Sequence, residues 1–176
     1  MVIEPIKDWK IFGEINYKVI DAFTHTDYLK VPQMNVAGEP YSGDTWKTSK
    51  VTEGAERTNY FNANVYSEYY RSFADAHHLK AMVGFQAEVN KWRQLQASKL
   101  DLISESVPSI NAATGESTID KSKLTHWATA GFFGRLNYDY KERYLLEVNL
   151  RYDGTSRFAK DKRWNLFPSF SAGWNV

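Results

Sequence analysis

Regular alternation of apolar with polar or small residues is the feature that most constrains this sequence. In the stretch RWNLFPSFSAGWNV, every second residue from Trp164 to Val176 is apolar. Successive side chains of a strand point to opposite faces, so this pattern indicates a strand with one apolar and one polar face. A helix would instead place its apolar residues three and four positions apart.

Five further stretches alternate in the same way. Their connections are short after the second and fourth strands and longer after the first, third and fifth, with polar loops at about residues 24–56 and 97–125. This order predicts an all-β, antiparallel up-and-down meander of about six strands. We expect one partial β-barrel segment over residues 1–176, with strands at residues 9–23, 57–73, 78–96, 126–140, 144–154 and 163–176.

Alternation alone leaves two partners open for the apolar face. A soluble sandwich packs this face against a second sheet, whereas a membrane barrel turns it toward lipid. The alternating runs span about ten to fifteen residues, longer than the five or six that are typical of soluble strands. The short turns fall on one side of the meander and the long loops on the other, as in outer-membrane barrels. These two features favour a larger transmembrane β-barrel.

The spacing of aromatic residues points the same way. Trp164 and Trp174 are ten positions apart, which is about 33 Å along a strand and about 25 Å across the membrane at a tilt of about 40°. Tyr144 and Tyr152 bracket the preceding strand in a similar way. Aromatic rings with a polar tip prefer the headgroup level of a bilayer. We therefore expect these four residues to form a lipid-interface girdle.

The opposite face of the fourth and fifth strands carries charged and amide side chains. In a barrel this face would line the lumen, and in a soluble sheet it would be the solvated outer face. Depending on the register of the hairpin, Arg135 falls opposite or diagonal to Glu147. The expected lumen-facing polar residues are Arg135, Asn137, Glu147, Asn149, Arg151 and Asp153.

Three consecutive motifs then resemble a known family. FFGRLNYDYK, YLLEVNLRYDGTSRF and RWNLFPSFSAGW follow one another within residues 131–176, and in this order they closely resemble barrel strands of SusC/RagA-type TonB-linked outer-membrane receptors. These motifs cover about a quarter of the chain. Residues 55–88 also resemble the family, but less distinctively.

The resemblance implies a segment of an outer-membrane importer for oligosaccharides or peptides in Bacteroidetes. Such receptors hold a plug inside a barrel of about 22 strands, work with a SusD-like surface lipoprotein, and draw energy from the TonB complex through the plug. This chain shows neither a secretory signal nor a plug segment, so we expect it to be part of a longer receptor. A soluble all-β carbohydrate-binding module stays open as the alternative.

Few other features suggest chemistry. The chain has no cysteine and a net charge of +1, which gives no reason to expect a thiol site or a nucleic-acid partner. We expect no catalytic residues, no metal site and no cofactor, because the common catalytic and metal-binding motifs are absent. Tyr41 and Trp46, which lie among polar residues, are weak candidates for ligand contact. Pro168 cannot donate to a strand ladder, so we expect a bulge or a missing hydrogen bond there.

Overall fold

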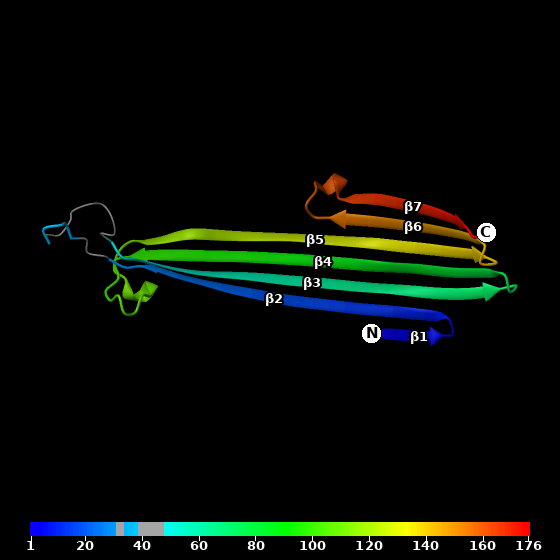
Figure 1. Cartoon of the computed structure of the whole chain (residues 1–176), viewed down its shortest axis with the longest axis horizontal. Coiled ribbons are helices and arrows are strands. Elements are labelled where there is room, and N and C mark those ends of the chain that lie inside the picture. Colours follow the sequence, from blue (N-terminus) through cyan, green and yellow to red (C-terminus); the bar gives the residue numbers. More distant parts are fainter. Residues whose placement is uncertain (31–33, 39–47) are drawn as a thin grey trace. The chain divides into compact units, whose positions relative to one another are not determined.

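The computed structural model describes residues 1–30, 34–38 and 48–176. Within them the chain forms one seven-stranded antiparallel sheet in which each strand pairs with the next along the sequence (Figure 1). Two 3₁₀ turns, η1 (Ile110–Ala112) and η2 (Lys160–Lys162), are the helical segments of the described residues, and neither has the length to cross a membrane. The strands are β1 (Val2–Ile6), β2 (Trp9–Tyr28), β3 (Lys50–Phe73), β4 (His77–Leu100), β5 (Ser117–Tyr140), β6 (Tyr144–Thr155) and β7 (Trp164–Trp174).

The predicted all-β meander is confirmed, but five of its six expected strands are longer, the last is shorter, and one more strand is present. β1 was not expected, and β4 continues to Leu100 rather than ending at residue 96. β5 begins at Ser117, within the stretch expected to be a loop up to about residue 125. This stretch, STIDKSKLT, has no apolar alternation. Its strand conformation follows from backbone pairing, which a side-chain pattern does not reveal.

The register of the last three strands is continuous and places the alternating residues on two faces. Val148 lies opposite Leu136 on β5 and opposite Phe170 on β7, whereas Asn149 lies opposite Arg135 and Ser169. Even-numbered residues of β5, β6 and β7 therefore share an apolar face, and odd-numbered residues share a polar face.

Pro168 is accommodated without a bulge, contrary to one of the two outcomes expected for it. It lies directly opposite Leu150 in an unshifted register. The backbone hydrogen bonds from Thr155 to Arg163 and from Asn175 to Arg143 show that odd-numbered residues form the hydrogen-bonded pairs between β6 and β7. Pro168 is even-numbered, so its nitrogen points away from β6. The ladder between β6 and β7 therefore loses no donor at this position.

Aromatic rings form two rows on the apolar face. In the first aromatic row, Phe132 lies 5.0 Å from Phe85 and 6.4 Å from Trp164 between ring centroids, and Trp164 stacks on Tyr152 at 4.9 Å. The apolar side chains beyond this row on β6 and β7 are exposed; those at Leu150, Leu166 and Phe170 are 47%, 56% and 72% exposed. Nothing among the described residues covers this face.

The second aromatic row lies toward the tight turns between β3 and β4 and between β5 and β6. His77 stacks on Phe73 at 5.0 Å and lies 4.8 Å from Tyr140, which in turn lies 6.3 Å from Tyr144. Trp174 is the partner of Tyr144 across β6 and β7. On β6 the two rows are eight positions apart, from Tyr144 to Tyr152, or about 26 Å along the strand.

The contacts within the chain divide it into two compact units. The first unit comprises Met1–Lys18, Asn59–Lys91 and His126–Val176, and the second comprises Val19–Thr58 and Trp92–Thr125. The second unit holds the buried side chains of the described residues, with η1 among the segments around them. Leu102 donates its backbone N–H to the hydroxyl of Ser49 at 2.8 Å, which satisfies a buried polar group. These buried side chains are Ser49, Val51, Thr52, Ser98 and Ala113.

Candidate functional site on the polar face

The polar face of β5, β6 and β7 carries all six residues that were expected to face a lumen. Each occupies an odd-numbered position of a continuous ladder, so the register brings them to one face of the first unit. Arg135 lies directly opposite Asn149, which makes Glu147 its diagonal neighbour. Alternation identified the face, and only the register shows which of its side chains meet.

Four of these residues form one hydrogen-bonded chain. Arg135 donates from Nε to Oδ1 of Asn149 at 2.6 Å, and Asn149 donates from Nδ2 to Oε1 of Glu147 at 2.6 Å. Asn137 donates from Nδ2 to the other carboxylate oxygen of Glu147 at 2.8 Å. The Glu147 carboxylate thus accepts from two amide groups, and the guanidinium of Arg135 lies at the other end of the chain. The Oδ1 atom of Asn137 is buried and has no partner among the described residues.

The other two residues form a bidentate ion pair. Arg151 donates from Nε and Nη2 to the two carboxylate oxygens of Asp153, both at 3.0 Å. The two residues are two positions apart on β6, so they lie on the same face. A Cβ atom at position 131 would lie 3.2 Å from Cγ of Asp153. Gly131 therefore leaves the space that this carboxylate occupies beside β5.

A row of aromatic side chains that was not expected from the sequence also crosses the polar face. Phe12 stacks on Tyr66 with ring centroids 4.5 Å apart. The ring of Phe133 lies over Gly84, and the Arg151 guanidinium lies 5.5 Å from the centroid of Phe133. Phe167 lies opposite Arg151 on β7. The available signal was that Phe12, Phe133 and Phe167 each interrupt an otherwise polar set of alternate positions.

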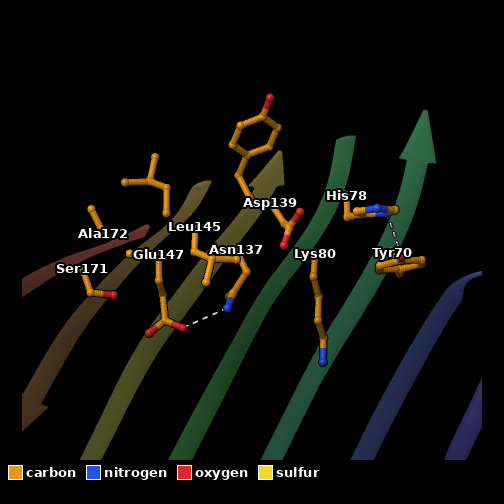
Figure 2. A pocket seen from close by; sticks show the side chains of 12 residues that line it. Tyr70, His78, Lys80, Asn137, Asp139, Leu145, Glu147, Ser171 and Ala172 are labelled. Atoms are coloured by element: carbon orange, nitrogen blue, oxygen red, sulfur yellow. Dashed lines mark hydrogen bonds between the residues drawn. The ribbon is translucent and has the colours of Figure 1, made fainter. Parts of the chain in front are cut away.

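Two of the hollows within the first unit border these polar residues. One has a volume of about 500 Å³ and is lined by charged side chains, among them Lys80 and Glu147, and by apolar ones, among them Leu145 and Leu146. Figure 2 shows the hydrogen bond from Asn137 to Glu147 at its edge and the contact between Tyr70 and His78 on the neighbouring strands. Lys80 forms an ion pair with Glu68 at 3.2 Å. The second hollow, near the connection between β6 and β7, has a volume of about 310 Å³.

The remaining expected sites have different outcomes. Tyr41 and Trp46 lie outside the described residues. In the described part of the chain no group of three or more His, Asp or Glu side chains is arranged to hold a metal ion. The four expected girdle residues lie on the apolar face at the two aromatic rows, with Tyr152 and Trp164 in one and Tyr144 and Trp174 in the other.

Comparison with known proteins decides the family. Residues 7–176 match the family model described as TonB dependent receptor-like, beta-barrel. The chain belongs to this family. It is a barrel segment of the SusC/RagA type, and receptors of this type are outer-membrane β-barrel proteins and not enzymes.

Curated relatives agree with this membership. The chain is 28% identical over 129 residues to TonB-dependent receptor P39 of Formosa agariphila. The matched segment covers 70% of this chain and 12% of the relative. The chain is also 53% identical over 45 residues to TonB-dependent receptor SusC of Bacteroides thetaiotaomicron. This matched segment covers 26% of the chain and 4% of the relative. The chain therefore spans a small part of the length of these receptors.

Solved structures share the fold. A structure of the RagAB peptide transporter superposes with a TM-score of 0.84 at 20% identity, over 97% of this chain and 18% of that chain. A structure of the RagAB peptide importer in the closed-closed state superposes with a TM-score of 0.85 at 21% identity, with the same coverage. At this identity the likeness concerns the arrangement of the strands.

Proposed function

We propose that this chain forms part of the barrel wall of an outer-membrane importer for oligosaccharides or peptides. The observation that carries the proposal is the two-faced sheet, with an exposed apolar face between aromatic rows and a polar face with a hydrogen-bonded network of charges. Membership of the TonB-dependent receptor family supports it. In this proposal the apolar face contacts lipid and the polar face lines the lumen.

The dimensions of the apolar face support contact with a bilayer. Trp164 and Trp174 delimit about 33 Å of β7, and Tyr144 and Tyr152 delimit about 26 Å of β6. At a strand tilt of about 40° these lengths project to about 25 Å and about 20 Å, close to the height of the lipid-facing band in outer-membrane barrels. These four residues are proposed as girdle residues. Outer-membrane localisation leaves the alternative of a soluble binding module without support.

We further propose that the receptor works with a SusD-like lipoprotein and with TonB. The similarity to TonB-dependent receptor SusC supports this organisation. The structural likeness to RagAB, whose solved structures are described as a peptide transporter and importer, keeps peptides as the second substrate class.

Uptake by the native host tests the proposal. The gene is deleted, and the uptake of fluorescently labelled oligosaccharides and labelled peptides is compared with that of the parent strain. We expect loss of one of the two uptake activities, and loss of the same activity when the proton gradient that drives TonB is collapsed. Unchanged uptake of both ligand classes, or release of the native protein from membranes by alkali without detergent, would overturn the proposal.

A further inference from the structure

The hollow of about 310 Å³ on the polar face has an excess of hydrogen-bond donors. It lies within the first unit where β6 connects to β7, and it is lined by arginines, carboxylates, amides and aromatic rings. The side chains on which the argument rests are Glu88, Arg151, Asp153, Arg163, Asn165 and Phe167.

Both arginines retain unused donors. A guanidinium carries five N–H donors. Arg151 uses one on Nε and one on Nη2 for Asp153. Arg163 uses Nε for the backbone carbonyl of Phe158 at 3.1 Å. In the part of the chain that the structure describes, the other guanidinium N–H groups of these two residues have no acceptor.

The carboxylates of the hollow are already engaged. Both oxygens of Asp153 accept from Arg151. Glu88 accepts from the hydroxyl of Tyr60 and, at 3.2 Å, from the hydroxyl of Thr129. Among the described residues neither carboxylate forms an ion pair with Arg163, so the remaining N–H groups of Arg163 can bind an acceptor that a ligand supplies.

The connection beside the hollow adds positive charge. Arg157, Lys160 and Lys162 lie between β6 and β7 with Asp161 as the acidic residue among them, so three cations and one anion give a net charge of +2. Arg157 also lies over the ring of Trp127 at 4.6 Å. An anionic ligand group is favoured at this end of the polar face by its electrostatic field as well as by the unused donors.

We propose that this hollow binds a carboxylate group of the transported ligand, held by the free guanidinium donors of Arg163 and Arg151. This inference rests on the proposed function, because it places a ligand group on the lumenal face of an importer. A planar carboxylate accepts two parallel N–H bonds from an arginine fork, so it matches the donors available here. Uronic acid units of an oligosaccharide and the C-terminus of a peptide both supply this group.

Binding to the purified full-length receptor tests the proposal with two matched pairs of probes. Oligogalacturonate is compared with a neutral galactose oligosaccharide of equal length, and a short peptide is compared with its C-terminal amide. The variants are Arg163→Gln and Arg151→Gln, with Arg163→Lys to separate charge from fork geometry. Arg143→Gln is the control, because Arg143 lies at the opposite end of β6, away from the hollow.

We expect an acidic probe to bind more tightly than its neutral counterpart, and each Gln variant to lose about tenfold or more of that affinity. Arg163→Lys should retain part of it, and Arg143→Gln should bind as the native receptor does. Loss confined to oligogalacturonate assigns the carboxylate to a uronate, and loss confined to the peptide assigns it to a C-terminus. The proposal is overturned if neither acidic probe is preferred, or if the Gln variants bind both acidic probes as the native receptor does.

Uptake distinguishes this result from failure of the proposed function. A receptor that imports its ligand but shows no arginine-dependent preference for acidic probes refutes the carboxylate site alone. A receptor that binds acidic probes through Arg163 and Arg151 but takes up neither ligand class refutes the importer function alone.

Discussion

The ring of Phe133 covers Gly84 so closely that a Cβ atom at position 84 would lie 2.7 Å from Cε2 of that ring. The same Cβ atom would lie 2.6 Å from Cβ of Tyr66, which cannot move without its backbone. Glycine therefore allows an aromatic side chain to lie across two strands of the polar face, a device that fixes the register of neighbouring strands.

Substitution of Gly84 should destabilise the sheet by overpacking. We expect Gly84→Ala to lower the free energy of unfolding of the receptor by about 1–3 kcal/mol, measured as a lower midpoint of unfolding in urea. Gly13→Ala is the control, because a Cβ atom there would meet nothing within 4 Å. Equal midpoints for the two variants would contradict the close packing of Phe133.

Register through Pro168 can be tested by cross-linking, since the chain has no cysteine of its own. Val148 pairs with Phe170, and Tyr152 pairs with Leu166, on either side of Pro168. Both are non-hydrogen-bonded pairs, with Cα atoms about 4.5 Å apart, within the range for a disulfide. Cysteines introduced at either pair should cross-link with a membrane-permeant oxidant, detected by mass spectrometry.

The control places the second cysteine on the other face. Val148→Cys combined with Ser169→Cys should not cross-link, because Ser169 is an odd-numbered residue of β7. Cross-linking of one native pair but not of the other would show that a bulge at Pro168 shifts the register.

Contact with lipid predicts unequal effects of lysine on the two faces of β7. Phe170 and Phe167 are 72% and 55% exposed and lie on the apolar and polar faces, respectively. Phe170→Lys should lower stability by about 2–4 kcal/mol, the cost of a lysine near the middle of the lipid face of a barrel. Phe167→Lys should lower it by less than about 1 kcal/mol. The measurement is reversible unfolding in lipid vesicles, and equal losses would argue against a lipid-facing apolar side.

The ion pair between Arg151 and Asp153 should contribute little to stability. Their side chains are 47% and 36% exposed, and exposed ion pairs contribute about 0–1 kcal/mol. We therefore expect Arg151→Gln and Asp153→Asn each to shift the free energy of unfolding by less than about 1 kcal/mol in the same assay. A larger loss would mean that the pair supports the sheet, and the binding results for Arg151→Gln would then need correction for unfolding.

The sequence predicted the fold and the faces well because both depend on a period of two residues. Alternation around Val148 and Asn149 is enough to assign each to a face. The register could not be predicted from the sequence, because the alternation of one strand carries no information on its pairing with the next strand. The structure shows that Asn149, rather than Glu147, lies opposite Arg135. The start of β5 at Ser117 was missed because that part of the strand carries no apolar stripe.

The candidate site was predicted in part. The polar residues of β5 and β6 were found from their alternation, whereas Arg163 and Phe167 were not considered because one lies at a strand end and the other breaks the pattern. The aromatic row on the polar face depends on Gly84, whose role appears only when Phe133 is seen to cover it. Contacts between residues far apart in sequence decide such features.

Pro168 occupies a non-hydrogen-bonded position of the β6–β7 ladder, and this has a consequence for assembly. The β6–β7 hairpin keeps every backbone donor between its two strands, whereas the outward edge of β7 lacks one at Pro168. A strand that adds to that edge therefore gains one bond fewer than β6 does. At equal length, that one bond favours the pairing of β7 with β6 over pairing at its outward edge.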